Sequence, residues 1–247
     1  MDEHINNYVI KKNLGRRISE NKNCLILVVG GTGSGKSYFS LDIASQLDPS
    51  FSIDRCCWDA VTFSKLISAR LPSGSAIIGD ELGVFMSARD WNKKENKALS
   101  KALQTIRFMN HYIFFTVPKL SMVDVNARQL FHFIVVAKGR IRGKTNVVDF
   151  HRLSENPRRP ESSPFRNPFF CKIKGELKQI SSFYSRLPPK DLIDEYEARR
   201  SDKIHKMLEK NLSDIGEQDD GAKVYYCSRC KITNDENKCK RCGDELN

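Results

Sequence analysis

Long apolar runs are what this sequence lacks. The longest, such as YIFFTV and FHFIVVA, are far shorter than the roughly 20 residues that a membrane-spanning helix needs. The N-terminal stretch MDEHINNYVIKKNLGRR contains no apolar segment of the kind found in secretory signals. We therefore expect no membrane span and an intracellular, cytoplasmic protein.

Acidic residues are in deficit. The 247 residues include 41 Lys and Arg against 30 Asp and Glu, a net charge of +11. Residues 138–178 hold 11 basic and 4 acidic residues, so 11 minus 4, or +7, of the excess lies there. In AKGRIRGKTN, Lys138, Arg140 and Arg142 alternate and would share one face of a regular strand. That face suits a phosphate backbone, and the alternative is a solvated basic surface.

The eight cysteines are distributed unevenly. Cys24, Cys56, Cys57 and Cys171 are scattered, whereas the other four form C-x2-C-x8-C-x2-C near the end of the chain. This module resembles a short zinc ribbon, in which two C-x2-C knuckles supply four thiolates to a tetrahedral, structural Zn²⁺. The expected zinc ligands are Cys227, Cys230, Cys239 and Cys242.

Strand-like and helix-like segments alternate up to about residue 153, which predicts an α/β fold with a mostly parallel sheet covered on both faces. We expect strands at 25–29, 75–81 and 112–117, a weaker strand at 53–58, and a strand and hairpin at 132–153. We expect helices at 36–46, 60–71, 92–110 and 123–131.

The amino-acid composition changes after residue 153, where Pro, Ser and Arg become frequent. The expected organisation is a basic N-terminal segment (1–23), a core with a basic hairpin (24–153), a linker with some strands and a charged helix (154–213), an acidic tether (214–222) and the zinc ribbon (223–247).

The segment from Gly30 to Ser37 matches G-x-x-x-x-G-K-[ST], between an apolar strand and a helix. The glycines let backbone amides point at phosphate oxygens, and the N-terminus of the helix adds a positive dipole. Lys36 can then reach the β/γ-phosphates, and Ser37 can bind Mg²⁺. The sequence therefore predicts an ATP site. Its binding residues, with Asp80, are Gly30, Gly31, Thr32, Gly33, Ser34, Gly35, Lys36, Ser37 and Tyr38.

A pair of carboxylates, Asp80 and Glu81, ends the apolar run AIIG. Open α/β sheets bind ligands at the carboxyl ends of their strands, so this pair should lie near the phosphate loop. Asp80 can hold the hydrated Mg²⁺ together with Ser37, and Glu81 can deprotonate the attacking water. This arrangement favours hydrolysis over transfer to a second substrate.

From Cys24 to His151, the order of these motifs resembles the additional-strand, catalytic-glutamate P-loop ATPases. Within them it is similar to the FtsK–HerA group, which includes genome-packaging ATPases of viruses and the filamentous-phage assembly ATPases. The resemblance implies a RecA-like P-loop NTPase core, a homo-oligomeric ring around DNA, a polar sensor and an arginine finger acting in trans. Thr116 takes the sensor position, where the group often has Gln, and the finger candidates are Arg107, then Arg89 and Arg128.

The sequence and the resemblance together predict an Mg-ATP-dependent motor that moves double-stranded DNA into a virion or between cells. A capsid or portal protein would then be a partner, and the protein would be in the host cytoplasm or associated with the virion. Two alternatives stay open: an assembly or secretion ATPase of the filamentous-phage type, and an ATP-gated DNA-binding switch in replication or partition.

Overall fold

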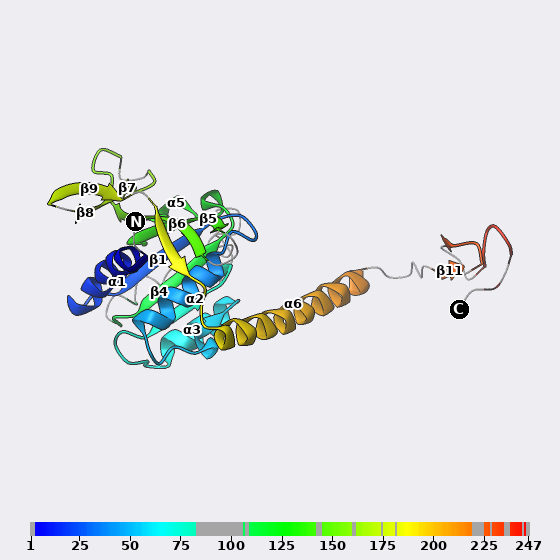
Figure 1. Cartoon of the computed structure of the whole chain (residues 1–247). Helices are drawn as coiled ribbons and strands as arrows, with labels where there is room; N and C mark the ends of the chain where they lie inside the picture. The colour runs from blue at the N-terminus through cyan, green and yellow to red at the C-terminus, as the bar shows by residue number, and fades with distance from the viewer. Residues whose placement is uncertain are drawn as a thin grey trace. The chain divides into compact units, whose positions relative to one another are not determined.

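The structure is a computed structural model of the chain (Figure 1). It describes residues 3–82, 106, 109–141, 145–159, 162–173, 175–180, 182–218, 225–227, 229–234, 238–243 and 245. The chain forms two compact units, Met1–Glu197 and Ala198–Asn247, and each is described by itself.

An eight-stranded sheet forms the centre of the first unit. Its strand order is β10-β6-β5-β1-β4-β3-β2, with β7 also paired to β6. The strands are β1 (Cys24–Val29), β2 (Cys56–Cys57), β3 (Ala76–Gly79), β4 (Tyr112–Val117), β5 (Phe133–Ile141), β6 (Thr145–Ser154), β7 (Phe165–Asn167) and β10 (Phe183–Arg186). Strands β1 to β5 run parallel, and β6, β7 and β10 are antiparallel to their neighbours. The expected α/β fold with a mostly parallel sheet is confirmed.

The central strands are apolar along their whole length. All six residues of β1 and all six of β4 are buried, the pattern of parallel strands that are covered on both faces. Strand β4 pairs with β1 on one side and with β3 on the other, with Val28 opposite Thr116 and Gly79 opposite Phe115. This register brings the carboxyl ends of β1, β3 and β4 to one edge of the sheet.

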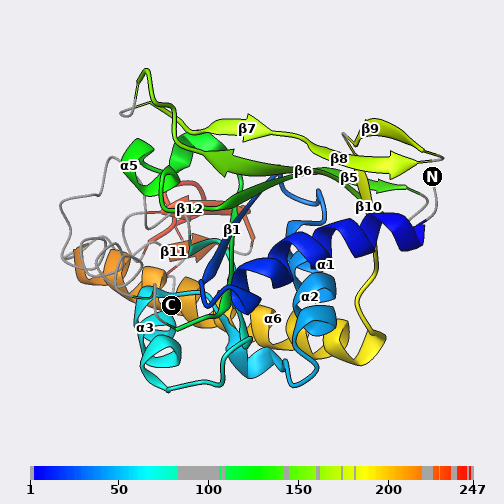
Figure 2. The ribbon, with the colours of Figure 1, turned by 90° about the vertical axis from the view of Figure 1, so that its left-hand side faces the viewer.

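Helices cover both faces of the sheet (Figure 2). Helices α1 (Glu3–Ser19) and α2 (Lys36–Leu47) share one buried cluster with residues such as Ile26 and Phe114. Helices α3 (Ala60–Ser68) and α5 (Val125–Arg128) belong to the cluster on the opposite face. Short 3-10 turns, η1 (Ile53–Arg55) and η4 (Leu120–Met122), complete the connections.

The N-terminal segment contributes to the core. Val9, Ile10 and Leu14 of α1 are buried, and Ile18 packs against the same cluster. Ile10, Leu14 and Ile18 are spaced four residues apart, so they form one stripe of the helix. The basic composition of residues 1–23 conceals this stripe, so the helix was not predicted from the sequence.

The other predicted elements agree with the structure in type, with two qualifications. Only Cys56–Cys57 of the expected strand at 53–58 is extended, because residues 53–55 form η1. The expected helix at 92–110 lies outside the described residues, except for Ile106, which is buried in the core, and residues 109–110.

A β-bulge in β5 changes the basic hairpin. Ala137 pairs with Val148 and Gly139 pairs with Val147, so Lys138 is an extra residue in the ladder. The prediction that Lys138, Arg140 and Arg142 share one face assumed an uninterrupted strand, and the bulge removes that basis. The Lys138 ammonium lies 2.8 Å from the Asp149 carboxylate.

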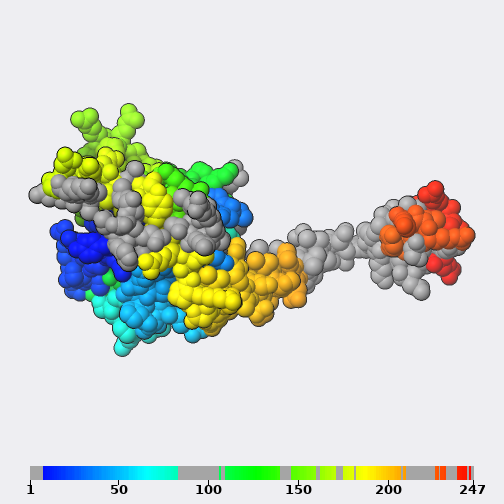
Figure 3. Space-filling view, viewed as in Figure 1, coloured from blue at the N-terminus to red at the C-terminus, as the bar shows by residue number. Residues whose placement is uncertain are grey.

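Two further hairpins and one long helix complete the chain. Strands β8 (Phe169–Ile173) and β9 (Glu176–Ile180) form a hairpin of their own, visible at the surface of the first unit in Figure 3. Helix α6 (Lys190–Gln218) begins in the first unit, and β11 (Tyr225–Cys227) pairs with β12 (Ile232–Asn234) in the second. Among the described residues, no helix has the length and apolar character needed to cross a membrane.

Candidate active site and metal centre

The glycine-rich loop joins β1 to α2 in a conformation that needs glycine. Gly33 and Gly35 have φ angles of 75° and 88°, in the left-handed region, and Gly35 immediately precedes the helix. A Cβ atom at Gly30 would lie 2.5 Å from the Ser34 hydroxyl and 2.8 Å from the backbone oxygen of Ala137. Position 30 therefore has no room for a side chain.

The loop has features that fit a bound phosphate. The Ser34 hydroxyl is buried and has no hydrogen-bond partner among the described residues, so it is available to a ligand. Gly31, Thr32 and Gly33 are exposed beside it, and the loop leads into the N-terminus of a 12-residue helix, where backbone amides and the helix dipole favour anions. Lys36 is only 7% exposed, and its ammonium donates a 3.0 Å hydrogen bond to the Gly31 oxygen.

Ser37 and Asp80 meet although 43 residues separate them. The Ser37 hydroxyl donates to Oδ1 of Asp80 at 2.8 Å, and Asp80 is only 1% exposed. A hydroxyl and a carboxylate oxygen are ligands that Mg²⁺ uses, directly or through water, in phosphate-binding sites. The donor set therefore fits the metal that the sequence predicts at this place.

Thr116 joins the two carboxylate residues. Its hydroxyl donates to Oδ1 of Asp80 at 2.8 Å and accepts a 2.8 Å hydrogen bond from the backbone N–H of Glu81. Thr116 is fully buried, whereas the Glu81 residue is exposed and has a left-handed φ of 58°. The threonine predicted as a sensor thus holds the backbone of the predicted base, and its role in sensing nucleotide stays a prediction.

The second oxygen of Asp80 has two partners that were not predicted from the sequence. The Tyr196 hydroxyl donates to Oδ2 at 2.5 Å, and the Trp58 ring N–H donates to it at 3.3 Å. Trp58 follows β2, and Tyr196 belongs to α6. No local pattern in the sequence connects either residue to the site.

Of the three arginines considered as fingers, only Arg128 lies within the described residues. Its side chain donates to the Val123 oxygen at 2.9 Å and to the Ser163 hydroxyl at 2.8 Å, and burial lowers its pKa. These bonds engage Arg128 within its own chain. Arg89 and Arg107 lie outside the described residues.

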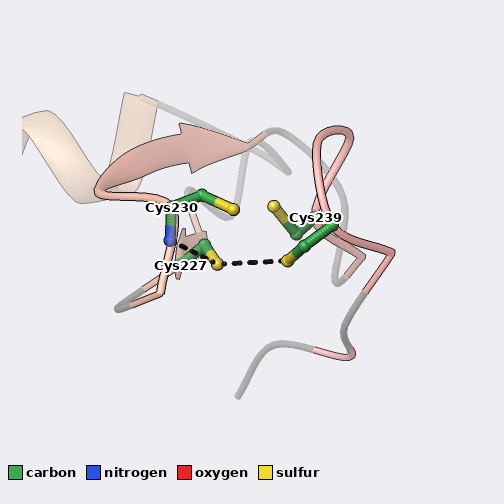
Figure 4. A group of neighbouring side chains, drawn as sticks. Cys227, Cys230 and Cys239 are labelled. Carbon is green, nitrogen blue, oxygen red and sulfur yellow. Dashed lines mark hydrogen bonds between the residues drawn. The ribbon is translucent and has the colours of Figure 1, made fainter.

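The four C-terminal cysteines form one cluster. Their sulfur atoms all lie within 4.8 Å of one another, and Figure 4 shows Cys227, Cys230 and Cys239 turned toward a common point. The Sγ atoms of Cys227 and Cys242 are 3.6 Å apart. A backbone bond from the Cys242 amide lowers the pKa of the Cys239 thiol to about 6. A tetrahedral set of four thiolates fits a structural Zn²⁺.

The two knuckles have the same backbone turn. The amide of Lys231 donates to the Cys227 oxygen, and that of Gly243 donates to the Cys239 oxygen, each at 2.8 Å. Lys231 and Gly243, each directly after the second cysteine of its knuckle, have left-handed φ angles of 54° and 78°. In each knuckle, this turn folds the chain back so that its two cysteines lie close together.

Removing one thiol should therefore abolish metal binding. Purified protein should carry close to one zinc per chain, and Cys230→Ser should carry none, because tetrahedral coordination needs all four thiolates. Elemental analysis of protein prepared without chelators measures both. The scattered, buried Cys57 provides the control, since Cys57→Ser should retain the metal; wild-type protein without zinc contradicts the assignment.

One family model and several solved structures are similar to parts of the chain. Residues 54–164, which include Asp80, Glu81 and Thr116, match the family model described as zonular occludens toxin (Zot). The N-terminal domain of zonular occludens toxin from Neisseria meningitidis is similar, with 19% identity over 60% of this chain and 94% of that chain and a TM-score of 0.39. The genome-packaging NTPase B204 of Sulfolobus turreted icosahedral virus 2, in complex with AMP, is 14% identical over 49% of this chain and 78% of that chain, with a TM-score of 0.34. No curated protein matches the chain.

The parallel sheet, the glycine-rich loop between β1 and α2, and the Ser37–Asp80 contact define the class of the protein. It has the α/β fold of the P-loop NTPases and a glycine-rich loop of the kind that binds phosphates.

Proposed function

We propose that this chain is an Mg-dependent ATPase that works as an oligomeric motor on double-stranded DNA. The observation that carries the ATPase assignment is the 2.8 Å contact between Ser37 and Asp80, with the exposed Glu81 next along the chain. One edge of the sheet thus presents the phosphate loop, an oxygen pair for the metal and a carboxylate for water.

Each residue has a role that follows from its chemistry. The loop amides and Lys36 would bind the phosphates, and Ser37 and Asp80 would hold Mg²⁺, which would neutralise phosphate charge. Glu81 accepts a proton from the attacking water, and Thr116 fixes the Glu81 backbone through the bond to its N–H. The base is thereby held next to the metal-binding carboxylate.

The strand order supports membership of the additional-strand ATPases. Strand β4 lies between β1, which carries the phosphate loop, and β3, which ends at Asp80. The class that the sequence resembles has its extra strand at this place, and Thr116 lies on β4. The finer assignment, to ATPases similar to the FtsK–HerA and genome-packaging group, is part of this proposal.

The DNA assignment is supported by charge. Five basic residues that follow the bulge of β5 are exposed on β6, β7, β9 and the β6–β7 connection: Arg152, Arg158, Arg159, Arg166 and Lys178. Such a surface binds phosphates without reading sequence, as a translocating motor requires. A homo-oligomeric ring around the duplex, a capsid or portal partner, and a location in the host cytoplasm or the virion complete the proposal.

Translocation can be tested directly. Long duplex DNA should stimulate ATP hydrolysis, and the protein should then displace streptavidin bound to a biotinylated duplex end. Arg158→Glu/Arg159→Glu should weaken the stimulation by roughly tenfold, because each lost phosphate contact weakens binding. Lys65→Glu/Arg70→Glu changes the same charge at exposed positions in and just after α3, which follows β2 at the other end of the strand order from β6 and β7, and should have little effect.

One surface favours a second candidate, an assembly or secretion ATPase that acts on a protein complex. Phe165 is 49% exposed, Phe170 is 54% and Leu177 is 70%, on β7 and on the β8–β9 hairpin. Exposed large apolar side chains are typical of protein contacts. Hydrolysis without DNA stimulation would favour this candidate, and DNA binding that depends on ATP without streptavidin displacement would favour a DNA-binding switch.

A further inference from the structure

The start of α6 reaches into the nucleotide site. Tyr196 is fully buried, and its hydroxyl donates the 2.5 Å bond to Oδ2 of Asp80. Its ring centroid lies 6.0 Å from that of Trp58 and 6.5 Å from that of Tyr38. The next residue of α6, Glu197, accepts a 3.0 Å hydrogen bond from the Tyr38 hydroxyl. Two consecutive residues of α6 thus contact the phosphate-loop helix and the metal-binding carboxylate.

Four donors hold the Asp80 carboxylate. Ser37 and Thr116 bond to Oδ1, each at 2.8 Å, and Tyr196 and Trp58 bond to Oδ2. Because Asp80 is 1% exposed, water does not compensate for a lost donor. The Tyr196 bond is the shortest of the four, and hydrogen bonds to a charged acceptor are the strong ones.

The hydroxyl and the ring of Tyr196 have separable roles. The ring belongs to the buried cluster of the sheet face that α1 and α2 cover, so it contributes to stability whether or not the site works. The hydroxyl donates a hydrogen bond to Asp80. Replacing Tyr196 with Phe keeps the ring and removes that one bond.

We propose that Tyr196 is a positioning residue for the metal-dependent step. Its hydroxyl holds Asp80 in the orientation that metal binding uses. Through this bond, the position of the start of α6 is coupled to the binding of metal and nucleotide. The inference rests on the proposed function, because it assigns Asp80 to the metal. Binding equilibria that share this bond are reciprocal. If the bond favours binding of metal and nucleotide, then bound metal and nucleotide also stabilise the contact between α6 and Asp80.

The test is metal-dependent nucleotide binding by Tyr196→Phe. A fluorescent ATP analogue is titrated with Mg²⁺ and again with EDTA, and the ratio of the two dissociation constants gives the gain in affinity due to metal. Outer partners of metal ligands typically change metal affinity about 10- to 100-fold, so the gain should fall about tenfold, with binding in EDTA unchanged. Tyr112→Phe is the matched control, since Tyr112 is also buried but lies at the opposite end of β4 from Thr116.

Hydrogen exchange of the wild-type protein tests the same link without a substitution. Amides of residues 190–197 should exchange at least several-fold more slowly with Mg²⁺ and nucleotide than with nucleotide and EDTA. An unchanged or larger metal-dependent gain in Tyr196→Phe, or equal exchange in the two conditions, overturns the positioning role while the proposed ATPase stands. Wild-type protein that shows no metal-dependent nucleotide binding overturns both proposals.

Discussion

Glu81→Gln should slow ATP turnover about a hundredfold or more while ATP binding stays nearly intact. Gln keeps the size of the side chain but cannot accept the proton of the attacking water, so the chemical step loses its base. The contacts on which binding depends, through the phosphate loop, Ser37 and Asp80, do not involve the Glu81 side chain. Steady-state hydrolysis and equilibrium titration with a fluorescent ATP analogue measure the two quantities separately.

Lys36→Ala is the contrasting variant. It removes the ammonium that the phosphates need, so it should weaken binding itself, and with it turnover. If Glu81→Gln hydrolyses ATP at the wild-type rate, the assignment of Asp80 and Glu81 to the metal and the base is wrong. If both variants lose binding equally, Glu81 has a role in holding the site together and not in the chemical step.

Arg107→Ala should lower turnover about a thousandfold with ATP affinity retained, by analogy with other arginine fingers. Arg107 is the first candidate for a residue that reaches the γ-phosphate bound by a neighbouring subunit. Arg128 is a weaker candidate, because its guanidinium donates hydrogen bonds to Val123 and Ser163 of its own chain. Arg128→Ala is accordingly the matched control, with turnover expected within a few-fold of wild type.

Mixing decides whether the finger acts in trans. Arg107→Ala and Lys36→Ala subunits, each inactive alone, should regain some ATPase activity in mixed rings, because some interfaces pair an intact Lys36 with an intact Arg107. Mixed rings that form and stay inactive at every ratio would contradict the trans assignment, and Arg89 would be the next residue to test. Near-normal activity of Arg107→Ala alone would identify it as an ordinary surface arginine.

Local patterns predicted most of the first unit. The phosphate loop and the Asp80–Glu81 pair could be located because their spacing and their flanking strands are properties of short segments. Apolar runs gave the central strands for the same reason. The bulge at Lys138 was not predicted, because the basic residues at alternate positions have the pattern of a regular strand.

Long-range contacts account for what the sequence did not reveal in the site. Tyr196 bonds to Asp80 across 116 residues, and its surroundings in the sequence read only as a charged helix. Trp58 reaches the same carboxylate from a segment with no motif. Helix α1 is a different case. The spacing of Ile10, Leu14 and Ile18 is a local pattern that indicates a helix, but the basic residues between them made the segment look like a solvated one.

The left-handed backbone of Glu81 limits how this protein can be engineered. A side chain other than that of Gly, Asn or Asp costs about 1 kcal/mol or more in that region, so the surrounding fold sustains strain at position 81. Glycine there would relieve the strain and remove the carboxylate in the same step. Any redesign that selects for thermal stability alone would therefore tend to replace Glu81 early, and position 81 has to be kept fixed if activity is to survive.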